Sequence, residues 1–279
     1  VHCARIPGRA LHAMPLSLAE LAPRVCDIAR QAADDILAVY HSEFTIQQKD
    51  DRSPLTAADL AAHRRIVDGL RKLTPDWPIL SEESAHIDWD TRRQWTRYWL
   101  VDPLDGTREF VKRNGEFTVN IALIDAGRSV LGVVQAPVSG ELAWAWSGGG
   151  AWIAQGQAQA RACRTRARGN PLRVAGSRSH GNPRMDSMLQ ALGPYELTPL
   201  GSSLKFLRIA SGEADLYVRL GPTSEWDTAA AQCVLEQAGG AVLDFHGQPL
   251  RYNGKESLLN PEFIACGDPR HDWAKLLSP

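Results

Sequence analysis

Acidic residues gather in four short clusters along this chain, and each cluster follows a predicted strand or opens a predicted helix. The clusters are Thr56-Ala57-Ala58-Asp59, Ser81-Glu82-Glu83-Ser84, Asp102-Pro103-Leu104-Asp105-Gly106-Thr107 and Trp226-Asp227-Thr228-Ala229-Ala230. Taken alone, each has an ordinary explanation as a solvated turn or a helix cap. Together, in this order, they predict one carboxylate-lined site that the fold must assemble.

Carboxylates placed at the ends of strands and helices suit a hard divalent cation. Mg²⁺ prefers oxygen ligands in near-octahedral geometry, and two such ions about 3.5–4 Å apart can activate water and hold a leaving oxygen. Asp102 ends a predicted strand, where the following proline favours extended backbone. Asp105 comes three residues later, close enough to join the same site after a tight turn. Asp227 begins a helix, whose dipole stabilises a carboxylate there.

The turn after Asp105 has features that favour a bound phosphate. Gly106 has no Cβ, so the backbone can approach an anion closely. If Thr107 begins a short helix, the free N–H groups of its first turn would face that anion.

The first half of the chain predicts two helices that cover an antiparallel sheet. Ser17 with Glu20 three residues later marks a capping box, and apolar residues follow at helical spacing up to Val39. A second helix should begin near Thr56. Its inward-facing residues are predicted to be Leu60, Val67, Leu70 and Leu73.

Short apolar runs predict the strands of this sheet. They lie at 78–81, 98–101, 117–124, 129–134 and 141–146. In the third run, alternation predicts one more polar face, formed by Thr118, Asn120 and Ala122.

The second half alternates strands with helices after a change of composition. Residues 154–170 carry four arginines among small polar residues and are expected to form a linker or an exposed loop. Strands at 172–175, 215–218, 241–244 and 263–266 alternate with helical patterns near 182–192, 202–211 and 226–238, which favours an α/β arrangement. We therefore expect a poorly ordered extension at 1–13, an N-terminal α+β domain at 14–153 with most metal ligands, and a C-terminal α/β domain at 154–279 with Asp227.

Composition narrows the functional classes. Hydrophobic residues make up 44% of the chain, enough for a sizeable core, and the net charge of −1 gives no reason to expect a nucleic-acid partner. The five cysteines are widely spaced without a C-x-x-C pair, which favours a reducing cytosol over a disulfide framework or a zinc site. No apolar run approaches the roughly 20 residues that span a bilayer, and residues 1–13 do not have the pattern of a secretory signal.

The ordered motifs S-E-E-S, D-P-L-D-G-T and W-D-T-A-A resemble those of the inositol monophosphatase superfamily, over nearly the whole chain. The flanks W-L-V-D-P-L-D-G-T-R-E-F, G-S-S-L-K-F and L-G-P-T-S-E-W-D-T-A-A most resemble the CysQ-type 3′(2′),5′-bisphosphate nucleotidases. The resemblance implies an α+β, layered α/β/α/β/α sugar-phosphatase fold. It also implies Mg²⁺-dependent, lithium-sensitive hydrolysis of adenosine 3′,5′-bisphosphate, a by-product of sulfate activation, to AMP and phosphate.

The resemblance also implies which residues bind metal. Glu82, Asp102 and the Leu104 carbonyl would bind a first Mg²⁺, and Asp102, Asp105 and Asp227 a second. Glu82 would also reach a third, more weakly held ion through water.

Catalytic and substrate-binding roles follow from the same resemblance. Thr107, with Asp59 nearby, would orient and deprotonate the attacking water, and Glu82 completes the expected catalytic set. Gly106 and Thr107 would donate backbone N–H groups to the phosphate, which also lies against the ligands Glu82, Leu104, Asp105 and Asp227. Two departures, Ser84 where the nucleotidase branch has Asp and Arg108 where it more often has Lys, touch no ligand but bear on substrate choice.

Recognition of the rest of the substrate is less well defined by the sequence. The segment G-S-S-L-K-F opens a helix at which Ser202 and Lys205 could bind the nucleotide, or Ser202 could simply cap the helix and Lys205 be solvated. Arg108, Lys112 and Arg113 either contact a second phosphate or form a solvated face. The arginines of 161–168 either form a solvated loop or fold over an anionic ligand.

Alternatives of two kinds stay open at this point. The chain could act on inositol phosphate or a sugar phosphate within the same superfamily, or it could be a catalytically silent metal or nucleotide sensor. The presence of Thr107, Asp59 and every ligand carboxylate argues against the sensor. The expected setting is cytoplasmic, either free or weakly associated with the cytoplasmic face of the inner membrane, as a monomer or homodimer.

Overall fold

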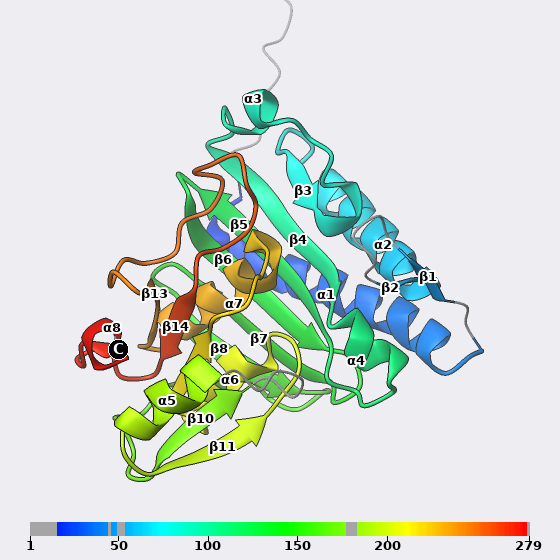
Figure 1. Ribbon diagram of the computed structural model, residues 1–279. Helices are drawn as coiled ribbons and strands as arrows, with labels where there is room; N and C mark the ends of the chain where they lie inside the picture. Colours follow the sequence, from blue (N-terminus) through cyan, green and yellow to red (C-terminus); the bar gives the residue numbers. More distant parts are fainter. Residues whose placement is uncertain (1–15, 44–45, 49–53, 177–182, 278–279) are drawn as a thin grey trace, which may run out of the picture.

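Two mixed β-sheets alternate with three layers of helices in this protein, seen here in a computed structural model that describes residues 16–43, 46–48, 54–176 and 183–277 (Figure 1). The expected extension at 1–13 lies outside the described residues. The layers follow the order α1 and α2, a seven-stranded sheet, α6 and α7, a five-stranded sheet, then α5 and α8. The layered α+β prediction is therefore confirmed.

The first layer pairs two helices whose starts the sequence predicts correctly. Helix α1 (Leu18–Tyr40) begins after Ser17, and α2 (Ala57–Leu73) begins after Thr56; each has a capping box, closed by Glu20 and Asp59 respectively. A short hairpin of β1 (Ile46–Gln48) and β2 (Pro54–Thr56) joins them. The prediction that Leu60 points inward is wrong, because this side chain is 37% exposed at the first turn of α2.

The seven-stranded sheet separates the first helical layer from the central one. Its strands run in chain order: β3 (Ile79–Ser81), β4 (Arg97–Asp105), β5 (Thr118–Asp125), β6 (Arg128–Ala136), β7 (Glu141–Trp146), β8 (Gly150–Gln155) and β9 (Arg161–Cys163). Only β3 and β4 pair in parallel. The expected linker at 154–170 is thus partly wrong, since 161–163 adds an edge strand.

Both faces of this sheet are buried, because helices cover each of them. Phe117, Val119 and Ile121 pack toward α1 and α2. The face expected to be more polar, with Thr118 and Asn120, is also buried and looks toward the central helices. Because buried polar groups need hydrogen-bond partners, these side chains are expected to bond neighbouring polar groups.

The central layer contains α6 (Leu204–Ala210) and α7 (Glu225–Gln237), which separate the two sheets. Near the middle of β6, Gly132 allows α7 to approach unusually closely. A Cβ at this position would lie 2.2 Å from the Ala230 carbonyl oxygen and 2.9 Å from the Cys233 Cβ. The seven-stranded sheet and α7 are therefore in direct backbone contact in the first half of α7.

Gly132→Ala is expected to lower the free energy of unfolding by about 1–3 kcal/mol, because the helix must move away from the sheet. Urea denaturation measures this change. Gly254→Ala is the matched control, since a Cβ there meets no atom within 4 Å, and its effect should stay within about 0.5 kcal/mol. Equal effects of the two substitutions would contradict the close approach.

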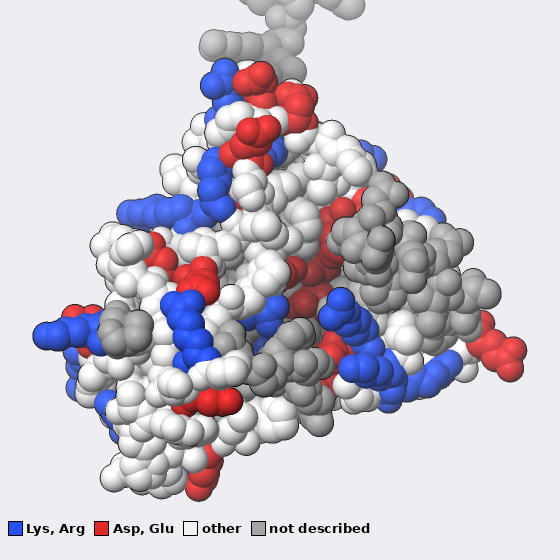
Figure 2. Space-filling model, viewed as in Figure 1, with Lys and Arg blue, Asp and Glu red and all other residues white. Residues whose placement is uncertain are grey.

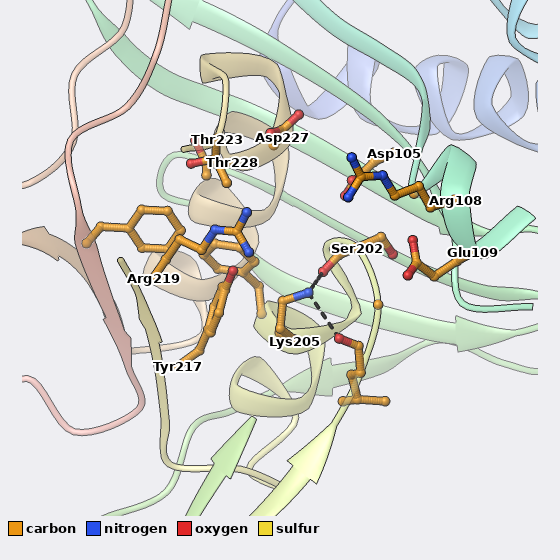
Figure 3. A pocket seen from close by; sticks show the side chains of 15 residues that line it. Asp105, Arg108, Glu109, Ser202, Lys205, Tyr217, Arg219, Thr223, Asp227 and Thr228 are labelled. Carbon is orange, nitrogen blue, oxygen red and sulfur yellow. Dashed lines mark hydrogen bonds between the residues drawn. The ribbon is translucent and has the colours of Figure 1, made fainter. Parts of the chain in front are cut away.

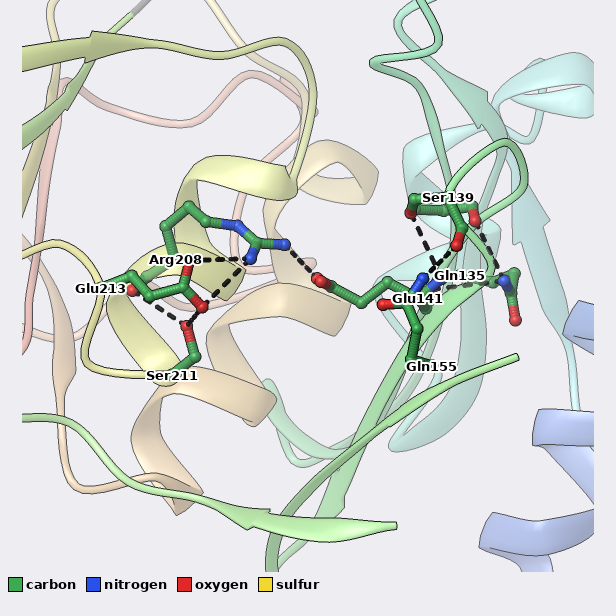
Figure 4. Close-up of polar contacts among 8 residues, drawn as sticks. Gln135, Ser139, Glu141, Gln155, Arg208, Ser211 and Glu213 are labelled. Carbon is green, nitrogen blue, oxygen red and sulfur yellow. Dashed lines mark hydrogen bonds and ion pairs between the residues drawn. The ribbon is translucent and has the colours of Figure 1, made fainter. Parts of the chain in front are cut away.

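A polar contact fixes α6 against the first sheet (Figure 4). The Arg208 guanidinium of α6 bonds the Glu141 carboxylate of β7 and also contacts Glu213, 3.1 Å away. Glu213 in turn accepts a hydrogen bond of 2.8 Å from Ser211. Because Glu141 is 8% exposed, this ion pair is largely shielded from water and holds α6 against the seven-stranded sheet.

The five-stranded sheet and two outer helices complete the fold. Its strand order is β11 (Tyr195–Pro199), β10 (Leu172–Gly176), β12 (Leu216–Arg219), β14 (Phe263–Cys266) and β13 (Ala241–Asp244). Helices α5 (Pro183–Ala191) and α8 (Trp273–Leu276) cover its outer face. The predicted strands and helices of this half are confirmed, whereas β11, which is mostly exposed, was missed.

Three short elements of the first half of the chain remain. They are the 3₁₀ turn η1 (Glu82–Ser84), α3 (Trp89–Arg92) and α4 (Thr107–Val111). Arg92, only 3% exposed, donates to Asn253 and to the carbonyls of Lys255 and Glu256, so it holds the loop before β14 against α3.

Candidate active site

A β-bulge places Asp102 and Asp105 on the same face of the sheet. Residues three apart in a regular strand point to opposite faces. Here Asp102 pairs with Asn120 and Asp105 with Thr118, so three steps along β4 match two along β5. The expected turn between the two aspartates is therefore a bulge within the strand, and both carboxylates face α7.

Asp227 meets these two carboxylates from the other side of the site. It is the third residue of α7, and its side chain accepts a hydrogen bond of 2.8 Å from the Ser224 backbone N–H. This capping box fixes the direction of the carboxylate. Oxygen atoms of Asp102, Asp105 and Asp227 all lie within 4.8 Å of one another.

The proximity of these carboxylates is unfavourable without a positive charge. Burial raises the pKa of Asp102 well above its ordinary value, and repulsion from Glu82, Asp105 and Asp227 raises it further. Burial and then repulsion from Asp105 raise the pKa of Asp227 to about 8. The pKa of Asp105 is raised by burial, although the ammonium of Lys205 opposes this. A divalent cation would remove the repulsion, and an all-oxygen donor set suits Mg²⁺.

Glu82 and the Leu104 carbonyl, both predicted metal ligands, lie near the aspartate cluster and the Thr107 hydroxyl respectively. Ser81 of β3 pairs with Val101 of β4, so Glu82 follows at the same sheet end as Asp102, within hydrogen-bonding reach of it. The Leu104 carbonyl is 3.4 Å from the Thr107 hydroxyl. Glu83 lies beside Glu82 in η1.

Thr107 and Asp59 are in direct contact, as the sequence predicts. The Thr107 hydroxyl donates to Asp59 Oδ1 over 3.3 Å. Asp59 is 1% exposed, and its other oxygen accepts bonds of 2.7 Å from the backbone N–H and the hydroxyl of Thr56. Gly106 precedes Thr107 with φ +96°, a left-handed conformation that favours glycine, and lets α4 begin directly after Asp105.

A pocket extends from these carboxylates toward the second sheet (Figure 3). It is lined by Asp105, Asp227, Arg108, Ser202, Lys205, Tyr217 and Arg219, among others. In this view Asp105 and Asp227 lie in the upper part of the pocket, with Arg108 beside Asp105, and Lys205 and Arg219 lie below them. The space-filling view shows acidic side chains gathered in a hollow near the middle of this face, with basic side chains close by (Figure 2).

The structure excludes both simple alternatives for Ser202 and Lys205. Helix α6 begins after Ser203, and Ser202 lies before it with φ +43° and a buried hydroxyl that has no hydrogen-bond partner among the described residues. Lys205 is 6% exposed, and its ammonium donates to the carbonyls of Ser202 (2.6 Å) and Leu200 (3.2 Å). Burial lowers the pKa of Lys205 to about 8, so the group still carries a proton at neutral pH. Ser202 therefore is not a helix cap, and Lys205 is not solvated.

Other cations proposed from sequence have different positions. Arg108 lines the pocket, but Arg113 bonds the carbonyls of Tyr40 and Ser42. Arg166, from the arginine-rich segment, forms an ion pair of 2.7 Å with buried Asp215.

Sequence reasoning missed four residues that line or support the site. They are Asn120, Ser203, Tyr217 and Arg219. An asparagine inside an apolar strand was the available signal for Asn120. Arg219 at the end of a strand had no local signal, because only the fold brings that strand end to the pocket.

The sequence pattern of the Inositol monophosphatase family matches residues 17–274, and the chain belongs to this family. It is 51% identical over 246 residues to the 3′(2′),5′-bisphosphate nucleotidase CysQ of Escherichia coli strain K12, covering 86% of this chain and 97% of that protein. The CysQ protein of Aggregatibacter actinomycetemcomitans is 39% identical over 265 residues, covering 94% of this chain and 98% of that protein.

A solved structure supports the same relationship. The crystal structure of CysQ from Bacteroides thetaiotaomicron, a bacterial member of the inositol monophosphatase family, superposes with a TM-score of 0.78 at 39% identity, covering 88% of this chain and 97% of that one. In the part of the present chain that the structure describes, no helix is long and apolar enough to cross a membrane.

Proposed function

We propose that this protein is a Mg²⁺-dependent 3′(2′),5′-bisphosphate nucleotidase that hydrolyses adenosine 3′,5′-bisphosphate to AMP and phosphate. The observation that carries this proposal is a carboxylate cluster next to a pocket with buried and exposed cations. A bisphosphate needs both parts, because one phosphate reacts and the other must be held. The names of the relatives that share about half of the sequence support the same activity.

In this proposal the part of the pocket around Asp105 and Asp227 holds the reacting phosphate. Glu82, Asp102, Asp105, Asp227 and the Leu104 carbonyl would hold two Mg²⁺ ions, with a third more weakly held. Bound divalent cations supply Lewis acidity to a phosphate ester and to water. The cluster fits them, since three mutually repelling carboxylates lie within 4.8 Å of one another.

Thr107 and Asp59 would act on the attacking water. Asp59 is held by two hydrogen bonds from Thr56 and accepts a hydrogen bond from the Thr107 hydroxyl, so the lone pairs of the threonine oxygen can orient water. A proton lost by that water can pass through the Thr107 hydroxyl to the Asp59 carboxylate. Backbone N–H groups of Gly106 and Thr107 would bind the phosphate oxygens.

In the lower part of the pocket in Figure 3, Lys205 and Arg219 would hold the second phosphate. The Arg219 guanidinium donates to the carbonyls of Gly221 (3.2 Å) and Pro222 (2.9 Å), which fixes its position beside Lys205 and Tyr217. Preorganised cations of this kind bind phosphate strongly. Ser202 Oγ, buried with no partner in the part of the chain that the structure describes, would hydrogen-bond the second phosphate as well.

Phosphate release tests this function directly. Adenosine 3′,5′-bisphosphate, inositol 1-phosphate and fructose 1,6-bisphosphate are compared with and without Mg²⁺. Strong Mg²⁺-dependent preference for the nucleotide is expected. Preference for either of the other two substrates would support metal-dependent hydrolysis but contradict the nucleotide as substrate. No phosphate release from any of the three would favour the sensor.

Lys205→Met is expected to raise KM for the bisphosphate by about 10–100-fold, since a charge-assisted contact of roughly 1.5–3 kcal/mol is removed. Adenosine 3′-monophosphate lacks the second phosphate, so its KM should change far less. Steady-state kinetics with both substrates measure the difference. Lys112→Met, at an exposed lysine outside the pocket, is the control. Equal KM changes for both substrates would contradict a second-phosphate role.

A further inference from the structure

Two buried polar side chains connect the aspartates that face each other across the site. Asn120 of β5 is 1% exposed and lies directly opposite Asp102 in the sheet, on the face that looks toward α7. Its amide nitrogen is 3.4 Å from Asp105 Oδ2 and 3.0 Å from the Ser203 hydroxyl. Thr118, two residues earlier on the same strand face, is 3.5 Å from the same Asp105 oxygen.

Ser203 continues this chain to the opposite side of the site. It is 1% exposed at the start of α6, and its hydroxyl donates to the Asp227 backbone carbonyl over 2.9 Å. Because that proton is committed to Asp227, the serine oxygen accepts from Asn120. One continuous path therefore runs from Asp105 through Asn120 and Ser203 to Asp227.

The path joins elements that are far apart in sequence. Asn120 and Ser203 are 83 residues apart, and they belong to the seven-stranded sheet and the central helical layer. A cation shared by Asp105 and Asp227 needs both carboxylates at a defined separation, and ligands are oriented by the groups that hydrogen-bond them. The Ser203 side chain also lies within hydrogen-bonding reach of the Asp105 carboxylate, so two contacts tie Asp105 to the start of α6.

We propose that Asn120 and Ser203 are positioning residues that hold Asp105 and Asp227 at the separation one bound divalent cation requires. The inference rests on the cation site of the proposed function. It assigns Asn120 to orienting the Asp105 carboxylate and Ser203 to fixing the first turn of α7 relative to it.

Isothermal titration calorimetry of Mg²⁺ into the metal-free protein, without substrate, tests this role. Asn120→Ala and Ser203→Ala are each expected to weaken Mg²⁺ binding by roughly 10–100-fold, in line with the effect of losing a group that hydrogen-bonds a metal ligand. Because both act through one hydrogen bond, the double variant should be little weaker than either single variant. The Mg²⁺ concentration for half-maximal phosphate release should rise by the same factor.

Ser129→Ala is the matched control, since it removes a buried hydroxyl from β6 at the end of the sheet away from the cluster. It should leave Mg²⁺ affinity unchanged. Unfolding temperature in a chelator separates a general loss of stability from a change in the site. Mg²⁺ affinity that is unaltered in both single variants, or altered equally by Ser129→Ala, overturns the positioning role. Absence of Mg²⁺ binding by the unmodified protein overturns the cation site itself.

Discussion

Asp102→Asn is expected to lower kcat for the bisphosphate by a factor of about 10²–10³, the size of effect that the loss of one preorganised electrostatic group has on kcat. Asp102 is 1% exposed, and the carboxylates of Glu82, Asp105 and Asp227 all act on its charge. It is therefore the carboxylate best placed to be shared by two cations. An amide of the same shape keeps the packing but removes the negative charge.

Stability of the metal-free variant distinguishes ligand loss from misfolding. Asp102→Asn removes one of the mutually repelling carboxylates, so its unfolding temperature in a chelator should equal or exceed that of the unmodified protein at pH 8. Stabilisation by Mg²⁺ should disappear. Asp68→Asn, at an exposed position of α2, is the control and should change neither property. Near-normal turnover by the Asp102 variant would show that the site assignment is wrong.

The metal-free protein is expected to lose stability as pH rises from about 5 to about 8, with a fall in unfolding temperature on the order of 5 °C or more. Burial raises the pKa of Asp227 from 3.8 to about 8. Burial likewise raises the pKa values of Asp102 and Asp105. Between the unfolded and folded pKa values, the folded state binds protons that the unfolded chain has lost. The stabilisation is therefore complete below pH 3.8 and is lost through about pH 8.

Saturating Mg²⁺ should flatten most of this dependence, because cations replace protons between the carboxylates. Burial also raises the pKa of Glu225 to about 7, and this residue lies outside the cluster, so a smaller slope should remain. Differential scanning calorimetry from pH 5 to 8, with chelator and with Mg²⁺, measures both curves. Lys205, whose pKa is lowered to about 8, affects stability above this range in the opposite direction. Parallel curves with and without Mg²⁺ would contradict a cation bound among these aspartates.

Local sequence signals predicted the elements that carry the site. Capping boxes at Ser17 and Thr56 depend only on residues three apart, so both helix starts were predictable. The strand that carries Asp102 and the helix that carries Asp227 in its first turn were equally clear, because an apolar run precedes the first aspartate and a helical pattern follows the second. Leu60 was misplaced because an apolar residue near a helix end can be exposed when no neighbouring element covers that turn.

The sequence by itself determined which residues carry charge and which elements present them, because hydrophobic periodicity, caps and acidic clusters are local properties. Only the tertiary structure decided how Asp102 and Asp105 share a face, since the bulge appears only when β4 pairs with β5. It also decided that Lys205 is buried and that Asn120 reaches Ser203, 83 residues away. Burial and distance depend on which layers pack together, and packing between distant segments leaves little trace in any short stretch of sequence.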